Sequence, residues 1–282
     1  MRACGVNRYN SVGFCKSDTV MRVCRIAPHR WEEPIISGTE GSGAVFFSGC
    51  SLGCVFCQNK DISRAAVGRA VSEEELAAEI LSLSRLGVHN INFVTPTHFA
   101  PSVIKTVAIA RERGLNLPIV YNTGSYEAAE TVRMLSGTVD VYLPDLKYRL
   151  SKTAEKYSGA ANYPTVARRA IEEMVKDVGG VKIKNGLIKR GVIVRILLLP
   201  MHLAEAKLSV KYLYENYGDD IYISLMNQYT PMPDMPKPLD RRVSRSEYRE
   251  LVDYAIALGV KNAFVQSEES AVGDYIPKFN LS

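Results

Sequence analysis

Short apolar runs and amphipathic segments alternate along the chain from residue 44 to near its end. The apolar runs are rich in Val, Ile and Leu and predict strands at 44–48, 90–96, 117–124, 139–147, 190–200, 220–228 and 261–266. Helically spaced apolar positions between them predict helices at 72–87, 101–113, 125–135, around 163–176, 203–216 and 244–258. In the first helix, Ser72 is the expected N-cap, Glu75 completes a capping box and Gly87 ends the helix. Strands joined by helices favour a parallel sheet that is buried on both faces.

Polar residues follow the predicted strands at one end of this sheet. In an open α/β sheet, and in a complete or partial barrel, ligands bind beyond the C-terminal ends of the strands. The residues near those ends are Cys50, Cys54, Cys57, Thr95, Thr97, His98, Asn122, Thr123, Asp145, Lys147, Arg195, Asn227 and Gln228. We therefore expect a single site at this end of the sheet.

Composition and charge indicate an ordinary globular protein, most simply of one large domain. Hydrophobic residues make up 46% of the 282 positions and charged residues 23%, which disfavours a disordered or disulfide-scaffold class. The formal net charge of +5 is mild and its residues are scattered, so no nucleic-acid partner is expected. The N-terminal "MRACGVNRYNSVGFC" lacks signal-peptide features, and no stretch approaches the roughly 18 apolar residues of a membrane span. We expect a cytoplasmic protein without a membrane partner.

Three cysteines lie close together in "FFSGCSLGCVFCQN", directly after the first predicted strand. Cys50, Cys54 and Cys57 have the spacing C-x3-C-x2-C, and thiols clustered in a reducing compartment are more often metal ligands or reactive groups than disulfides. A structural zinc needs four ligands, yet no cysteine follows Cys57 and the histidines stand singly. A redox dithiol of Cys54 and Cys57 leaves Cys50 unexplained. Three thiolates can instead hold three irons of a cubic iron–sulfur cluster and leave the fourth iron open.

The segment "GCSLGCVFCQN" resembles the signature of the radical S-adenosylmethionine (SAM) superfamily, C-x3-C-x-aromatic-C, with Phe56 in the aromatic position. The resemblance implies a partial (β/α)6 TIM-like barrel of parallel strands, which agrees with the alternation of strands and helices. It also implies two cofactors, a 4Fe-4S cluster on Cys50, Cys54 and Cys57, and SAM on the open iron. In that superfamily one electron from the cluster cleaves SAM to methionine and a 5'-deoxyadenosyl radical.

A closer resemblance covers most of the chain. The family related to pyruvate formate-lyase activating enzyme, often called PflX-like, is similar in the segments "CGVNR", "GFC", "WEEPIISGTEGSG", "FFSGCSLGCVFCQN", "NINFVTPTHF", "YNTGSYE" and "YLPDLKY". This resemblance implies hydrogen abstraction from a protein or peptide, with a glycyl radical enzyme as one candidate partner and flavodoxin or ferredoxin as candidate electron donors. We expect an N-terminal extension over 1–43 that packs on the barrel and a radical SAM barrel domain over 44–282.

Two pairs of residues are candidates through the activase resemblance. Asp145 and Lys147 in "PDLK" resemble the Asp-x-Lys of activases, where the pair lies near the substrate backbone. They alternate with Leu146 on a strand and so face one way, and a rim salt bridge is the alternative interpretation. Thr95 and Thr97 stand where activases carry a Gly-Gly-Glu-type turn for the amino group of SAM. They offer hydroxyl groups but no carboxylate.

The remaining candidates each have a structural alternative. Asn122 and Thr123 in "YNTG" are expected to contact the ribose or methionine part of SAM, or else Thr123 caps a helix. Arg195 in "VIVRILLL" needs a carboxylate partner, either from the methionine of SAM or from Asp145. His98 is either a ligand or proton donor, or a histidine bonded to the backbone at a helix entry.

Three cysteines outside the cluster segment form no compact set. The PflX-like N-terminus looks like C-P-x-x-C-G-V, so a second metal site on Cys4 and Cys15 is a hypothesis beside free thiols, which is also the alternative for Cys24. The basic range 177–190 is either a mobile loop or a docking surface. Two other functions stay open at this point: a radical SAM enzyme that acts on a small molecule and, from a different class, a zinc-stabilised binding module.

Overall fold

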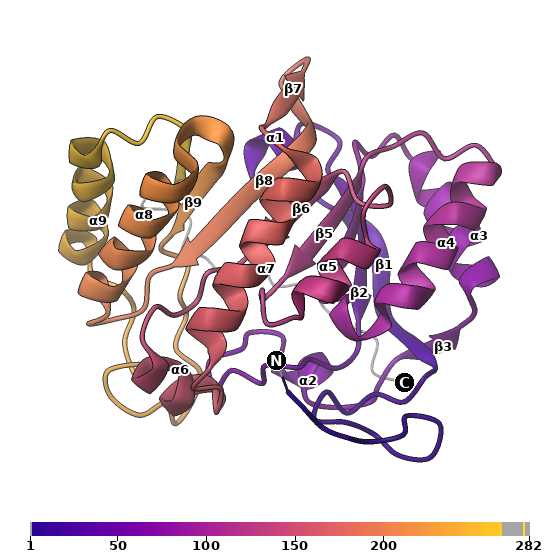
Figure 1. Ribbon diagram of the computed structural model, residues 1–282, viewed down its shortest axis with the longest axis horizontal. Helices are drawn as coiled ribbons and strands as arrows, with labels where there is room; N and C mark the ends of the chain where they lie inside the picture. The colour runs from indigo at the N-terminus through magenta and orange to yellow at the C-terminus, as the bar shows by residue number, and fades with distance from the viewer. Residues whose placement is uncertain (1, 267–278, 280–282) are drawn as a thin grey trace.

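The structure is a computed structural model that describes residues 2–266 and residue 279. A mostly parallel sheet forms its centre, with helices packed along it (Figure 1). From one edge, the parallel strands are β10 (Ala263–Val265), β9 (Tyr222–Met226), β8 (Leu187–Leu197), β6 (Val141–Pro144), β5 (Ile119–Thr123), β4 (Ile91–Val94) and β2 (Ser42–Phe47). Each predicted strand is present, and the α/β partial barrel with parallel strands is confirmed.

Antiparallel strands extend the sheet beyond the predicted barrel. β1 (Met21–His29) pairs with β2, and β3 (Arg69–Val71) pairs with β1. Part of the range 1–43, predicted as an extension, is therefore hydrogen-bonded into the sheet. The boundary between residues 43 and 44 stays a prediction, and the end of the predicted barrel domain, at 267–278 and 280–282, lies outside the described residues.

The basic range 177–190 forms a hairpin arm. Its strand β7 (Lys182–Lys184) is exposed and pairs antiparallel with the start of β8. Asn185 and Gly186 connect the two strands with φ of 54° and 74°, as a type I′ turn requires. In Figure 1 this hairpin projects from the end of the sheet opposite to the short helix α2 (Lys60–Ser63), which follows the cysteine segment.

The longer helices agree with the predicted pattern. They are α3 (Glu73–Ser84), α4 (Ala100–Glu112), α5 (Ala129–Met134), α7 (Tyr163–Val178), α8 (Leu203–Tyr217) and α9 (Arg245–Leu258). The capping box of Ser72 and Glu75 is present. α5 begins later than predicted because Ser125, at φ 62°, lies in the left-handed region. The short elements α1 (Pro34–Ser37), α2, α6 (Ser151–Ser158), η1 (Thr97–Phe99) and η2 (Gly218–Asp220) were not predicted. No helix within residues 2–266 combines the length and apolar composition that a bilayer-spanning segment needs.

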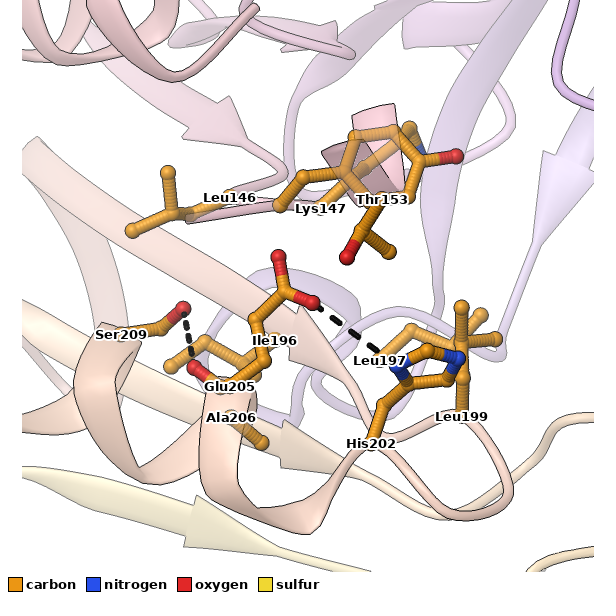
Figure 2. Close-up of a pocket in the computed structure, with 11 residues that line it drawn as sticks. Leu146, Lys147, Thr153, Ile196, Leu197, Leu199, His202, Glu205, Ala206 and Ser209 are labelled. Carbon is orange, nitrogen blue, oxygen red and sulfur yellow. Dashed lines mark hydrogen bonds and ion pairs between the residues drawn. The ribbon is translucent and has the colours of Figure 1, made fainter. Parts of the chain in front are cut away.

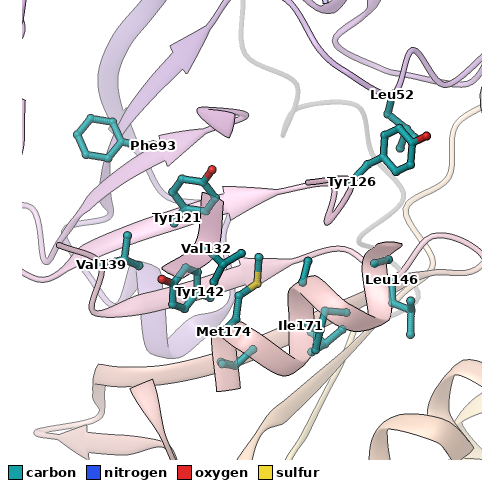
Figure 3. Packing of buried hydrophobic residues seen from close by; sticks show 14 of the residues in the cluster. Leu52, Phe93, Tyr121, Tyr126, Val132, Val139, Tyr142, Leu146, Ile171 and Met174 are labelled. Atoms are coloured by element: carbon teal, nitrogen blue, oxygen red, sulfur yellow. The ribbon is translucent and has the colours of Figure 1, made fainter. Parts of the chain in front are cut away.

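The two faces of the sheet differ in chemistry. Side chains of the outer face, including Phe93, Tyr121 and Tyr142, pack in the main core, which also holds side chains from α5 and α7 (Figure 3). On the inner face, a smaller cluster of Val120, Val141, Leu143, Ile188 and Ile193 is closed by Ile36 of α1. Towards the C-terminal ends of the same strands the inner face becomes polar, with Asn122, Asp145 and Arg195, and Asn92 lies beside them on the neighbouring β4. The inner face of the sheet thus carries a layer of polar side chains above the apolar cluster, at the end where ligands bind in parallel α/β sheets.

Candidate active site

A cavity of about 930 Å³ lies at the C-terminal ends of the strands. Its lining includes the residues predicted to bind the cluster, SAM or substrate: Cys50, Cys54, Phe56, Cys57, Thr95, Thr97, Asn122, Thr123, Asp145, Lys147 and Arg195. Gln228 also lines it, whereas His98 and Asn227 do not. The structure therefore brings the predicted residues together, and the role of each stays a prediction.

The cysteine loop leaves β2 through Gly49, at φ 85°. A Cβ atom at this position would collide with the backbone oxygen of Cys15 and the hydroxyl of Ser17, so only glycine fits. After this turn the three cysteines enter the cavity wall.

Hydrogen bonds reach each of the three sulfurs. The hydroxyl of Ser158 donates to Cys54 Sγ over 3.1 Å, and that of Ser63 donates to Cys57 Sγ over 3.4 Å. The backbone N–H of Leu52 donates to Cys50 Sγ over 3.4 Å. Donors of this kind stabilise thiolates and set the reduction potential of an iron–sulfur cluster.

The burial and close packing of Cys50 and Cys54 disfavour ionisation of their thiols in the absence of a bound cluster. Burial, with the nearby Cys54 and Cys57, raises the pKa of Cys50 to about 11, and burial also raises the pKa of Cys54. Iron ions bound by these cysteines would remove this penalty, because a coordinated thiol is held as the thiolate. Within residues 2–266, no three His, Cys, Asp or Glu side chains converge on one ion. Cys50, Cys54 and Cys57 are thus not arranged around a single ion, whereas in a cubic cluster each would bind a different iron.

Asp145 lies between two cations. Its Oδ1 accepts from Arg195 Nε over 2.7 Å, and its Oδ2 accepts from Lys147 Nζ over 2.6 Å. Burial alone would raise the pKa of the Asp145 carboxyl, but Arg195 and Lys147 hold it below its usual value. Asp145 and Lys147 face the cavity together, as their spacing predicts, and Asp145, one of the two partners expected for Arg195, is bonded to it.

Glu32 completes this network and was not predicted. Its Oε1 accepts from Asn92 over 2.9 Å and from Asn122 over 3.1 Å, and its Oε2 accepts from Arg195 Nη1 over 3.1 Å. Arg195 Nη2 donates to Asn122 Oδ1 over 2.6 Å. One carboxylate from the segment before α1 therefore links polar side chains of β4, β5 and β8. In the sequence, Glu32 is one of two adjacent glutamates in "WEEP", and two adjacent acidic residues match no motif spacing that would indicate a site.

The threonines at the ends of β4 and β5 lie side by side. Thr97 and Thr123 hydroxyls are 3.3 Å apart, and Thr123 donates to the buried carboxyl of Glu127 over 2.6 Å. Thr95 has φ 57°, an unusual conformation for a β-branched residue, of the kind found at functional sites. Thr123 also accepts from the backbone N–H of Ser125 over 3.2 Å, which is a local turn rather than a helix cap.

Phe56 and His98 both support the cysteine loop. The Phe56 ring makes edge contacts with Tyr148, Tyr157 and Tyr229, with centroids 6.2–6.3 Å apart. His98 Nε2 lies 2.6 Å from the backbone oxygen of Ser48, and burial lowers its pKa to about 4. His98 is therefore a neutral, backbone-bonded histidine, the second of its two interpretations.

A small pocket of about 10 Å³ behind the strand end that bears Lys147 has room for about one water molecule (Figure 2). Glu205 of α8 lies in it and accepts from the backbone N–H groups of Arg149 and Leu150, over 2.7 and 2.9 Å. Its other oxygen lies 3.7 Å from His202 Nδ1. This buried carboxylate fixes the loop that follows Lys147.

The N-terminal segment covers the cysteine loop. The Arg2 guanidinium donates to the backbone oxygens of Ser51 and Leu52, over 3.2 Å each, and lies 3.8 Å from the centre of the Phe14 ring. A Cβ placed on Gly13 would lie 3.5 Å from the Cys4 sulfur and 3.7 Å from the Cys15 sulfur. The second metal site on these two cysteines stays a hypothesis. Cys24 is buried in β1, where its thiol lies 3.7 Å from the Val67 oxygen.

We expect Ser158→Ala to make the reduction potential of the cluster more negative, on the order of tens of millivolts. Reduction adds negative charge to the cluster and its thiolates, and the lost hydrogen bond to Cys54 stabilised that charge. Anaerobic potentiometric titration followed by electron paramagnetic resonance measures the shift. Ser63→Ala is the matched control, and its shift should be smaller because its contact with Cys57 is longer. An unchanged or more positive potential in Ser158→Ala would contradict the prediction.

Proteins similar to this chain match most of its length or share its fold. An uncharacterised protein of Methanocaldococcus jannaschii is 29% identical over 266 residues, which cover 89% of this chain and 72% of that protein. Streptococcus suis SuiB has a TM-score of 0.53 and 14% identity over 80% of this chain. Methylornithine synthase (PylB) has a TM-score of 0.51 and 17% identity over 76% of this chain and 62% of its own. The chain spans 50% of the length of SuiB, and these structural likenesses show the fold.

A family model described as the radical SAM superfamily matches residues 44–205, which is more than half of the chain. The match begins in β2 and includes the cysteine loop and the strand ends that carry Asp145 and Arg195. Members of this superfamily use a 4Fe-4S cluster and SAM, and one electron from the bound cluster cleaves SAM to a 5'-deoxyadenosyl radical. The cavity lining, with its three cysteines and polar strand ends, fits both cofactors. The chain therefore belongs to the radical SAM superfamily and uses these two cofactors.

Proposed function

We propose that this radical SAM enzyme abstracts hydrogen from a protein or peptide partner, in the manner of the PflX-like family, with a glycyl radical enzyme as the leading candidate. One observation carries the proposal. The segments "WEEPIISGTEGSG", "NINFVTPTHF", "YNTGSYE" and "YLPDLKY", which resemble that family, are far apart in the sequence, yet all four contribute residues to the lining of one cavity.

The shape of the cavity supports a polymeric substrate. Its lining extends from the cysteine loop to Trp31 and Val265, which are 65% and 51% exposed. A peptide segment can therefore enter from the surface and reach the interior without the rest of the partner being enclosed. At the inner end, SAM and a bound substrate would displace water from around the reacting atoms, which favours radical chemistry.

The residues of the cavity divide between the two ligands. We propose that Phe56, Thr95, Thr97, Asn122 and Thr123 hold SAM beside the cysteine loop. We also propose that Asp145 and Lys147 position the substrate backbone, since their charges are fixed by each other and by Arg195. Arg195 has Asp145, Glu32 and Asn122 as partners, so a contact with the carboxylate of SAM would be additional to these three.

The partners and the cell compartment are proposals of the same kind. A one-electron donor such as flavodoxin or ferredoxin would reduce the cluster. No nucleic-acid or membrane partner is proposed, since the positive residues are scattered along the sequence. A cytoplasmic location is proposed because a reducing compartment keeps cysteine ligands available for a cluster.

The proposal predicts where the abstracted hydrogen comes from. The reconstituted enzyme would be reduced with dithionite in the presence of SAM and an extract of source cells grown on glycine deuterated at the α carbon. Separating the extract into protein and small-molecule fractions before the reaction distinguishes the two substrate classes. We expect 5'-deoxyadenosine to gain one deuterium with the protein fraction, together with a glycine-centred radical signal on a polypeptide.

Two results would oppose this proposal. Deuterium transfer from the small-molecule fraction would favour a small substrate, the alternative radical SAM function. Formation of 5'-deoxyadenosine without deuterium from the protein fraction would exclude glycine as the reacting residue. Cys57→Ala serves as the control, since it should give no 5'-deoxyadenosine with either fraction.

A further inference from the structure

Glu33 is a buried carboxyl in the cavity lining whose hydrogen-bonding capacity is only partly used. The residue is 8% exposed, and its Oε2 has no hydrogen-bond partner. Glu33 stands at the N-cap of α1, where an acidic side chain normally accepts backbone N–H groups, yet it makes no such bond. The α1 backbone instead contacts its main-chain oxygen, which accepts from Ile36 and Ser37. Capping of α1 therefore does not account for the presence of a buried carboxyl at position 33.

The groups around Glu33 are already engaged. The Glu33 carboxyl interacts with its own backbone N–H and with the hydroxyl of Ser224 in β9, and burial raises its pKa in spite of the positive charge of Arg195. Arg195 directs its donors to Asp145, Glu32 and Asn122. Glu33 is thus left as a carboxyl without a cation of its own, which costs free energy in a buried site.

A count of the charged side chains in the cavity lining also indicates that Glu33 lacks a cationic partner. Its acidic side chains are Glu32, Glu33 and Asp145, and its basic side chains are Arg30, Lys147 and Arg195. Arg30 pairs with Glu40, which is outside the lining, at 3.9 Å. His29, also in the lining, has a pKa lowered by burial and is neutral at pH 7. Arg30 is exposed, so the less exposed part of the lining holds three carboxyls and only two cations, Lys147 and Arg195.

From this geometry we infer that Glu33 and Ser224 form a subsite for a cationic side chain of the substrate, a guanidinium or an ammonium group. The inference rests on the proposed function and deepens it, since it assigns a lysine or arginine near the reacting residue of the polypeptide. Because Oε2 is itself buried, such a group would donate to it once the Glu33 side chain turns towards the cavity that it lines, and would supply the missing positive charge. Trp31, two positions away and exposed at the cavity lining, would lie along the entry path.

Trp31 also provides a signal, because it is the one tryptophan in the sequence. The test titrates the reconstituted holoenzyme, with SAM present, with capped tripeptides Gly-Arg-Gly and Gly-citrulline-Gly. Citrulline keeps the shape of arginine and removes its charge. We expect saturable fluorescence changes, with the arginine peptide bound at least about tenfold more tightly, as for hydrogen bonds to charged groups. In Glu33→Gln the preference for arginine should disappear.

A matched control is Glu130→Gln, which removes a carboxylate that is 74% exposed and lies outside the cavity lining, and which should keep the preference. Unchanged near-ultraviolet circular dichroism and iron content would show that Glu33→Gln is folded and loaded. Equal affinity for the two peptides, no saturable change with the arginine peptide, or a preference that survives Glu33→Gln would overturn the inference. Agmatine, a free guanidinium, tests the other source: binding as tight as that of the arginine peptide would overturn the polypeptide assignment.

The binding test is independent of the deuterium-transfer test. If the arginine preference depends on Glu33 while no deuterium is transferred from protein, the subsite stands and the proposed reaction on glycine fails. If deuterium is transferred from protein and the arginine preference is absent, the proposed reaction on glycine stands and the subsite fails.

Discussion

Replacing Cys54 by alanine is expected to abolish the iron–sulfur cluster and reduce the formation of 5'-deoxyadenosine to background. Each cysteine of the loop would hold a separate iron, so loss of one thiolate leaves an iron without a protein ligand. Anaerobic reconstitution followed by iron and sulfide analysis measures the cluster, and chromatography of the reaction measures the product. The same loss is expected for Cys50→Ala and Cys57→Ala.

Cys24→Ala provides the matched control for this experiment. Cys24 is as buried as Cys54, but it lies in β1 outside the cavity lining. Its substitution should leave iron, sulfide and product formation intact, with only a small loss of stability from the removed sulfur. A Cys54→Ala protein with full iron and sulfide content would refute the assignment of the cluster ligands.

The parts of the site that could be predicted are those with a local signal. The three cysteines have a spacing within eight positions, and Asp145 and Lys147 have the two-residue spacing of one strand face, although β6 ends just before them at Pro144. Neither signal requires the tertiary fold. The meeting of these segments in one cavity follows from parallel strands, whose C-terminal ends lie at one edge. Periodicity located the barrel strands because each is a continuous apolar run.

The residues that could not be predicted depend on long-range contacts. Glu32 meets Arg195 across 163 positions of sequence, and nothing in "WEEP" indicates that it folds against β8. Glu205 has the sequence context of an exposed helix residue, and only the loop after Lys147 makes it a buried acceptor. β1 was missed because its arginines, proline and histidine interrupt the alternation expected of a strand.

Arg195→Met is expected to lower the free energy of unfolding by about 3–5 kcal/mol, since it removes the shared cation of a buried network. Glu32 would keep only amide donors, and Asp145 would keep only Lys147. Urea unfolding under anaerobic conditions measures the change, with the slope in urea expected to stay the same. Arg133→Met is the control, because Arg133 is 53% exposed and solvent screens its ion pairs with Glu130 and Glu173, so the free energy of unfolding should change little.

The pH dependence of the free energy of unfolding, compared between the wild type and Arg195→Met, distinguishes the charge pairing of Arg195 from its packing. In the wild type the folded-state pKa of Asp145 lies below its unfolded value, so its contribution is complete above about pH 3.9 and decreases as the pH falls through the folded pKa. Arg195→Met should weaken this dependence, because only Lys147 would then lower the Asp145 pKa. If Arg195→Met cost no more than Arg133→Met and kept the acid dependence of the wild type, Arg195 would act through packing alone. The hydrogen bonds of Arg195 to Asp145, Glu32 and Asn122 would then not stabilise the fold, and the packing of the strands alone would hold these polar side chains in place.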